Sequence, residues 1–296
     1  MLKRVIDVSS RSYIHIRNQQ LIINQNNEDV GSIPVEDLGV LILQHPAITL
    51  SIAVVTSCQK NNVVVVFCDE HHLPSSTLLP LTTGHSLHSK ILACQINLKL
   101  PLRKRLWKEI VSMKLQEQHN TLLQYGKSSE RILKLSREVK SGDPENSEAQ
   151  AAKIYWKILL GKGFKRDTEE PGANTLLNYG YTIIRALFAR AIVSSGLHPT
   201  LGLHHRNQYN ALCLADDLME PCRAWVDFYV VELVNRGIYE INSDSKARLL
   251  SLISANVKYD NQIMPLMIAC HYLVSRLKRI YQGETLRLLY PSLLDQ

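Results

Sequence analysis

A change of hydrophobic pattern near Gly84 constrains the fold more than any other feature of the sequence. Before this point, apolar and polar residues alternate over residues 12–17, and the apolar runs 38–43 and 63–67 have the length of buried strands. After it, apolar residues recur at helical spacing, most clearly over residues 101–125. The chain therefore divides into a part that favours sheets and a part that favours helices.

We accordingly predict an α+β fold, in which a small β-rich N-terminal domain of residues 1–84 precedes a larger all-α domain of residues 85–296. In the second domain, Ser147 and Gln150 have the spacing of a capping box, which puts Glu148 in the first turn of a helix. Further helices are expected over residues 90–100, 101–125, 174–195, 217–236, 244–257 and 264–282.

Positive charge is concentrated in the predicted helical domain. The chain has 296 residues and a formal net charge of +7. Residues 1–95 contain six basic and seven acidic residues, so residues 96–296 carry a net charge of +8. A basic domain favours a polyanionic partner, with nucleic acid as the first candidate, although a solvated cationic surface is the simpler alternative.

Hydropathy and cysteine spacing indicate a cytoplasmic protein. No apolar run approaches the roughly 18 residues that span a bilayer. Asp7 interrupts the N-terminal stretch where a signal peptide would be apolar. The six cysteines include no close pair of the kind that binds structural zinc or builds a disulfide framework, so we expect reduced and mostly buried thiols.

Three segments concentrate side chains that bind divalent metals, namely Glu148, residues 204–205 and residues 216–220. Two carboxylates and an imidazole suit Mg²⁺ or Mn²⁺, which can polarise a phosphoryl oxygen and activate a hydroxyl group or water. Each segment also has a simpler interpretation. Glu148 can be a carboxylate favoured by the helix dipole, Asp217 and Glu220 can form a capping box, and the histidines can be hydrogen-bonded loop residues.

Four motifs occur in a fixed order along the chain. They are EAQAAKIYW at 148–156, LLNYGY at 176–181, GLHPTLGLHH at 196–205 and ADDLMEP at 215–221, accompanied by segments 41–46, 68–74 and 100–107. With these motifs the chain closely resembles, over nearly its whole length, the CRISPR-associated integrase and endonuclease subunit of spacer acquisition, in particular its type II branch. The resemblance implies a β-rich N-terminal domain and a helical catalytic domain.

The resemblance also implies that three side chains are both catalytic residues and ligands of Mg²⁺ or Mn²⁺: Glu148, His205 and Glu220. The family's spacing from Gly202 selects His205 rather than His204 as the ligand. Asp217 is expected to cap a helix or to support the ligands, with direct ligation as the alternative role.

The implied activity is metal-dependent phosphodiester transfer. The 3′-hydroxyl of a short foreign DNA fragment attacks a phosphodiester at the edge of a CRISPR repeat and inserts the fragment as a new spacer. With water as the attacking group, the same site would cut DNA. Two alternatives stay open, a general metal-dependent nuclease of DNA repair and a non-catalytic scaffold that bridges DNA.

The implied partners are double-stranded DNA and other proteins. Candidate phosphate contacts close to the motifs are Lys153, Lys162, Lys165, Arg166, Arg206 and Arg223. The family implies a homodimer formed through the N-terminal domain, and two such homodimers bridged by a dimer of a small adaptation protein. In type II systems, further adaptation proteins and the effector nuclease are expected partners.

Overall fold

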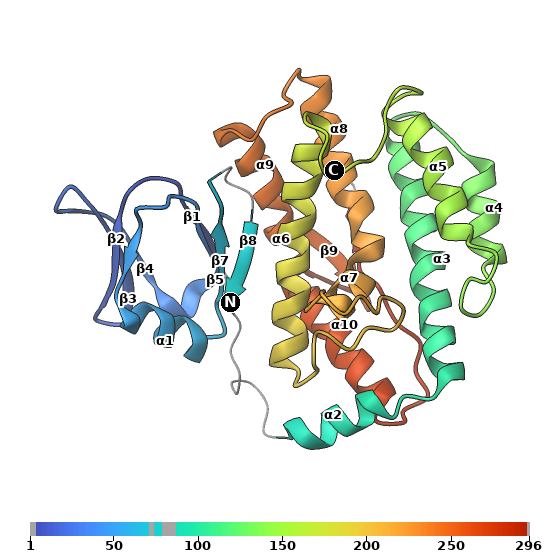
Figure 1. Ribbon diagram of the computed structural model, residues 1–296, viewed down its shortest axis with the longest axis horizontal. Helices are drawn as coiled ribbons and strands as arrows, with labels where there is room; N and C mark the ends of the chain where they lie inside the picture. Colours follow the sequence, from blue (N-terminus) through green and yellow to red (C-terminus); the bar gives the residue numbers. More distant parts are fainter. Residues whose placement is uncertain (1–3, 71–73, 79–86, 295–296) are drawn as a thin grey trace. The chain divides into compact units, whose positions relative to one another are not determined.

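A computed structural model describes residues 4–70, 74–78 and 87–294 of the chain. The chain divides into two compact units, the first of Met1–Ser86 with Val193–Gly196 and the second of Leu87–Ile192 with Leu197–Gln296. The first unit is built on sheets and the second is mostly helical, which confirms the predicted α+β fold class (Figure 1). The predicted boundary at residue 84 lies outside the described residues, as do residues 71–73 of one motif.

The described residues between 4 and 78 form two four-stranded sheets, one α-helix and one short 3₁₀ helix. The strand orders are β1-β5-β7-β8 and β4-β3-β2-β6. The elements are β1 Arg4–Val8, β2 Tyr13–Arg17, β3 Gln20–Gln25, β4 Glu28–Pro34, the 3₁₀ helix Val35–Asp37, β5 Leu38–Leu43, β6 Thr49–Leu50, α1 Ile52–Lys60, β7 Val64–Cys68 and β8 Pro74–Leu78. The apolar runs predicted as buried strands form β5 and β7, which pair in parallel.

Two-residue turns connect the antiparallel strands β2, β3 and β4. Asn18 and Gln19 have φ angles of 51° and 61°, and Asn26 and Asn27 have φ angles of 51° and 67°. Turns with two positive φ angles match the twist of the strands they join, and asparagine adopts this conformation more readily than most residues. The hairpins therefore have a local cause in the sequence.

One apolar core holds the first unit together. It contains side chains from both sheets and from α1: Val8, Ile14, Leu21, Ile33, Leu38, Leu41, Val54, Cys58 and Val65. All six residues of β5 are buried, which explains why this strand reads as a continuous apolar run rather than as an alternating one.

The longest described helix of the second unit is α3, which runs alongside α4 and α5 (Figure 1). Its elements are α2 His88–Ile96, α3 Leu100–Gln124, α4 Glu130–Glu138, α5 Ser147–Leu159, α6 Ala173–Ser194, α7 Cys213–Met219, the 3₁₀ helix Glu220–Cys222, α8 Arg223–Asn235, α9 Ser243–Ser254, β9 Asn256–Tyr259, β10 Gln262–Pro265, α10 Leu266–Tyr281 and β11 Ser292–Leu293. α3 packs against α4, α5, α8 and the 3₁₀ helix. It thereby contacts several segments that are far apart in the sequence.

The second unit is mostly helical, as predicted, but it also contains a small three-stranded sheet that an all-α domain would lack. β9 and β10 form a hairpin around Asp260 and Asn261, whose φ angles are 47° and 64°, and β11 pairs with the other edge of β9. The predicted helix 244–257 therefore ends earlier, at Ser254. Strands of two to four residues are too short to show a clear period, and the pairing of β11 with β9 is not local.

The predicted helix 217–236 is also wrong as a single element. The chain forms α7, then the 3₁₀ helix, then α8, and α7 begins before the predicted start. Pro221 lacks the N–H group that a continuous α-helix would use, so the backbone tightens at this point. Glu220 consequently lies at a junction between two helices.

The six cysteines all lie among the described residues, and none forms a disulfide. Cys58, Cys213, Cys222 and Cys270 are buried, as expected for thiols that pack as small apolar groups. Within the described part of the chain, no helix is both long enough and apolar enough to cross a bilayer.

Candidate functional site

Glu148 lies in the first turn of α5, and the preceding loop determines where this helix begins. Asn146, with a φ angle of 54°, is the N-cap, and its Oδ1 accepts a hydrogen bond from the N–H of Ala149 at 3.4 Å. The carboxylate of Asp143 accepts from the N–H groups of Ser147 at 2.9 Å and Glu148 at 3.1 Å. The predicted N-cap is therefore one residue too late, because asparagine tolerates the left-handed backbone that this turn requires.

Glu220 is buried where α7 meets the 3₁₀ helix, with 4% of its surface exposed. Burial alone would raise the pKa of its carboxyl group, but the neighbouring charges of Arg223, Lys114 and His205 lower that pKa to about 2. The Nε of Arg223 donates to Oε1 of Glu220 at 3.1 Å. Glu220 is therefore an ionised carboxylate in a site with little solvent.

Lys114, on α3, contacts both of the predicted glutamates. Its Nζ donates to Oε1 of Glu148 at 2.6 Å and to Oε2 of Glu220 at 2.5 Å. Two residues far apart in the sequence thus meet at one cationic atom. Lys114 is absent from the predicted site residues. The one sequence feature that could have identified it is its spacing, three residues after Val111 and seven after Trp107, which puts it on the buried face of the helix.

Asp217 orients the imidazole of His205. Its carboxylate is fully buried in α7 and accepts from Nδ1 of His205 at 2.7 Å. It also accepts from the backbone N–H groups of Leu203 at 2.6 Å, His204 at 3.1 Å and His205 at 3.2 Å. The hydrogen bond with Asp217 raises the pKa of His205, against the lowering effect of burial. With Nδ1 bonded to Asp217, Nε2 is the nitrogen available to a metal or a proton.

Gly202 allows the backbone to pass close to this carboxylate. A Cβ atom at position 202 would lie 2.5 Å from the carbonyl oxygen of His205 and 2.7 Å from Oδ2 of Asp217, so only glycine fits. Asp217 lies inside α7 rather than at its start, so the alternative of a capping box with Glu220 is wrong. Its contacts are those of a residue that supports His205.

The rings of His204 and His205 have different neighbours. The His204 ring stacks on Trp107, with a centroid distance of 4.2 Å and an interplanar angle of 5°. The His205 ring meets the edge of the same tryptophan at 5.9 Å and 85°. Of the two imidazole rings, that of His205 is the one that Asp217 contacts and that interacts electrostatically with Glu220.

The predicted metal ligands share one neighbourhood but do not form a ligand cage. Within the described residues, no group of three or more histidine, cysteine, aspartate and glutamate side chains is arranged to hold a metal ion. Lys114 lies between Glu148 and Glu220, while Nδ1 of His205 contacts Asp217. His205 and Glu220 are close enough that each shifts the pKa of the other.

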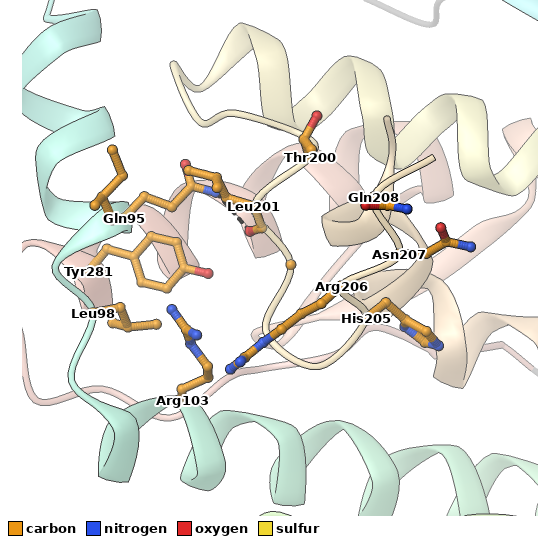
Figure 2. A pocket seen from close by; sticks show the side chains of 12 residues that line it. Gln95, Leu98, Arg103, Thr200, Leu201, His205, Arg206, Asn207, Gln208 and Tyr281 are labelled. Atoms are coloured by element: carbon orange, nitrogen blue, oxygen red, sulfur yellow. Dashed lines mark hydrogen bonds between the residues drawn. The ribbon is translucent and has the colours of Figure 1, made fainter. Parts of the chain in front are cut away.

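Two cavities that border His205 contain arginines. One, of about 400 Å³, is lined by Arg166, Arg185 and Arg223. The other, of about 350 Å³, is lined by Arg103 and Arg206, which extend toward each other from α3 and from the loop 198–209 (Figure 2). Cationic side chains therefore flank the histidine in both cavities.

The six predicted phosphate contacts divide into two groups. Arg166 and Arg223 line the cavity of about 400 Å³ beside His205, and Arg206 lines the cavity of about 350 Å³. The three lysines are exposed and line neither cavity: Lys153, Lys162 and Lys165. Arg103 and Arg185 also line these cavities but are not among the predicted contacts, since both lie outside the four motifs.

A buried carboxylate lies behind Arg223. Asp227 accepts hydrogen bonds from the hydroxyl groups of Tyr155, at 2.9 Å, and Tyr181. Burial raises the pKa of Asp227 to about 7, although both tyrosine hydrogen bonds act to lower it. The guanidinium of Arg223 lies over the Tyr181 ring, 4.6 Å from its centroid. Asp227 thus positions the Tyr181 ring, and this ring contacts the guanidinium of Arg223, the partner of Glu220.

Residues 8–251 match the family described as CRISPR associated protein Cas1. The chain belongs to the Cas1 family. It is 32% identical to the CRISPR-associated endonuclease Cas1 of Neisseria meningitidis serogroup C (strain 8013). The alignment spans 279 residues and covers 93% of this chain and 91% of the relative. Membership confirms the predicted family and supports a function in CRISPR adaptation over a general repair nuclease or a DNA-bridging scaffold.

Solved structures share the fold of the whole chain. A Cas1 protein from Thermotoga maritima superposes with a TM-score of 0.78 at 17% identity, over 96% of this chain and 99% of that one. A casposase bound to integration product superposes with a TM-score of 0.77 at 20% identity, over 97% of this chain and 93% of the casposase chain. A Cas6-RT-Cas1–Cas2 complex gives 0.74 at 18% identity, over 95% of this chain and 35% of the other. At these identities the likeness is evidence of the fold alone.

Proposed function

We propose that this Cas1-family chain is the metal-dependent integrase of CRISPR adaptation, of the type II branch, and that Glu148, His205 and Glu220 form its catalytic centre. The observation that carries the proposal is the convergence of two carboxylates, the partly exposed Glu148 and the buried Glu220, on one ammonium group beside an oriented histidine. The names of its relatives add support, since the Neisseria protein is a CRISPR-associated endonuclease and the casposase is bound to an integration product.

The side chains present fit a hard divalent cation. Oxygens of Glu148 and Glu220 already contact a shared cation, the ammonium of Lys114, so their separation suits a single bound charge. Mg²⁺ and Mn²⁺ prefer carboxylate oxygens and accept imidazole nitrogen, which Nε2 of His205 can supply. When bound there, the ion would polarise the phosphate and lower the pKa of the attacking hydroxyl group.

The chain's own residues account for the remaining requirements of the reaction. Arg223 keeps Glu220 ionised, and Asp217 holds the His205 ring so that Nε2 faces away from Nδ1 and can take up a proton. A P–O bond forms between the fragment's 3′-oxygen and the repeat phosphorus, and the bond to the leaving oxygen breaks. The proton lost by the attacking hydroxyl group balances the one gained by the leaving oxygen.

Phosphate recognition is the role we propose for the arginines of the two cavities, with Lys153, Lys162 and Lys165 as outer contacts. Such contacts hold DNA of any sequence and weaken as salt rises. We also propose a homodimer that works with a small adaptation protein of the Cas2 type. The support is the fold shared with the Cas6-RT-Cas1–Cas2 complex.

An integration assay tests the proposal. Wild type is mixed with the small partner, a repeat-bearing plasmid, a short duplex with free 3′ ends, and Mn²⁺ or Mg²⁺. We expect Glu148→Gln, Glu220→Gln and His205→Ala each to lower strand joining by at least about 100-fold, because each removes a group that acts on the reacting phosphate. Glu145→Gln removes an exposed carboxylate from the loop before α5 and serves as the control.

Each alternative gives a different result in this assay. Undiminished joining by all three variants would contradict the proposed centre. Cutting of branched DNA without any joining would indicate a repair nuclease. Retained DNA bridging with no covalent change in any sample would indicate a scaffold.

A further inference from the structure

Lys114 combines burial with two short ionic contacts. Its side chain is 12% exposed, and its ammonium contacts one oxygen from Glu148 and one from Glu220. The residue comes from the middle of α3, which also packs on α5 and on the 3₁₀ helix that carry the two glutamates. The position of the ammonium is therefore set by three packed elements.

This position is the one that a divalent ion shared by the two glutamates would need. An ammonium and a hard metal ion compete for the same carboxylate oxygens, since both bind through charge. Two cations cannot share one such position, because their repulsion is strong where solvent is scarce. Either the metal ion or Lys114 can lie between the carboxylates.

The formal charges of the cluster lead to the same conclusion. Glu148 and Glu220 carry two negative charges, and Lys114 and Arg223 carry two positive charges, so the cluster is neutral. The nearby Asp216 and Asp217 are already engaged with Arg185 and His205. A divalent ion added without the departure of Lys114 would leave an excess of two positive charges in a buried site.

We propose that Lys114 occupies the position of the divalent cation in the metal-free protein, and that the cation binds by displacing its ammonium from Glu148 and Glu220. The inference rests on the proposed metal site. The flexible four-carbon stem of lysine allows the ammonium to leave without movement of α3. Lys114 therefore stabilises the empty site, and it weakens metal binding by competition.

Direct measurement of Mn²⁺ binding to the full chain tests the inference. Electron paramagnetic resonance reports the free Mn²⁺ remaining as protein is titrated. Lys114→Met removes the charge and keeps all but the last atom of the side chain's length, and we expect it to lower the Mn²⁺ dissociation constant by about tenfold. Lys114→Arg keeps a competing charge and should show no such gain. Lys108→Met, an exposed position on α3, is the matched control.

Thermal unfolding provides a second measurement. Without metal, Lys114→Met leaves the carboxylates of Glu148 and Glu220 facing each other with no ammonium between them, so its Tm should lie below that of wild type. Mn²⁺ should raise the Tm of this variant more than that of wild type. Lys114→Gln, whose amide can still donate to both carboxylates, gives the same comparison if the methionine variant folds poorly. Equal or weaker Mn²⁺ binding by both neutral variants would overturn the inference.

Glu148→Gln distinguishes failure of the inference from failure of the proposed function. If this variant binds Mn²⁺ as wild type does, the metal site itself is wrongly assigned. If it loses binding while the neutral Lys114 variants show no gain, the metal site stands and Lys114 supports the carboxylates instead of competing for them.

Discussion

At the scale of single residues, the loop that carries His205 depends on one buried carboxylate. Asp217 accepts three backbone N–H groups and the His205 ring, so one side chain fixes both the path of the loop and the direction of the imidazole. Gly202 is the residue that permits this approach. The geometry of the loop is thus determined by contacts that a single added methyl group would disturb.

Gly202→Ala tests this dependence. The added Cβ would overlap the carbonyl oxygen of His205 and a carboxylate oxygen of Asp217. We expect strand joining to fall by about 100-fold, since small displacements of catalytic groups have effects of this size. Gly163→Ala is the control, because a Cβ there meets nothing within 4 Å. Unchanged joining by Gly202→Ala in the integration assay would contradict the description of the loop.

Asp227 provides a prediction about pH. Its pKa is about 7 in the folded protein and 3.8 as the ordinary value. Between these two values the folded state keeps the Asp227 proton that the unfolded state releases. The stabilisation of the folded state by this proton is complete below pH 3.8 and is lost as the pH rises to about 7. The shift corresponds to about 4 kcal/mol.

Urea unfolding at pH 4.5, 6 and 8 measures this contribution. The wild-type free energy of unfolding should fall more steeply with rising pH than that of Asp227→Asn, which has no proton to lose. Asp244→Asn, at an exposed position, should follow wild type. Parallel curves for wild type and Asp227→Asn would show that Asp227 is ionised across this range.

At the scale of elements, the beginning of α5 determines where Glu148 points. Asp143 accepts the first two N–H groups of the helix, and Asn146 accepts another. Asp143 has a φ angle of 49°, so this residue also forms the turn before the helix. The residues that cap the start of α5, Asp143 and Asn146, therefore precede residues 147–150, the segment in which the sequence pattern placed the cap.

Asp143→Ala should lower the free energy of unfolding by about 1–2 kcal/mol, because two N–H groups lose their acceptor and alanine is strained in the left-handed region. Asp143→Asn keeps an acceptor and tolerates the same φ angle, so it should lose less than half as much. Urea unfolding compares the two variants. Equal losses would show that the hydrogen bonds to α5 do not decide the stability of its first turn.

At the scale of the whole molecule, the net charge of +8 on residues 96–296 suits the proposed binding of DNA. The arginines of both cavities lie beside His205, where the proposed function requires a phosphodiester to be held. Contacts of this kind release counterions, so affinity falls with salt in proportion to their number. The salt dependence of binding is therefore a measure of how many cations touch the backbone.

Arg206→Ala should weaken binding of duplex DNA and should reduce the slope of log affinity against log salt concentration by about one. Fluorescence anisotropy with a labelled duplex between 50 and 200 mM salt measures the slope. Arg236→Ala removes an exposed arginine at the end of α8 and should leave the slope unchanged. The same slope in all three proteins would exclude Arg206 from the interface.

The sequence by itself determined the features that have local causes. Periodicity separates the sheet-forming and helix-forming parts, and the ordered motifs identify the family and select Glu148, His205 and Glu220 as the candidate site. It misplaced the cap of α5 by one residue and missed the break at Pro221 within a predicted helix. These errors concern backbone geometry that a period of apolar residues does not encode.

Only the tertiary structure decided which distant residues meet. In the sequence, Lys114 is one of several basic residues of an amphipathic helix. Its contacts with Glu148 and Glu220 arise only because α5 and the 3₁₀ helix pack against α3. Asp217 reads as a helix cap until the loop folds over its carboxylate. β11 has no strand signal without β9 beside it. The physical reason is that the energy of a buried charge or a paired strand edge depends on the partner that the whole fold supplies.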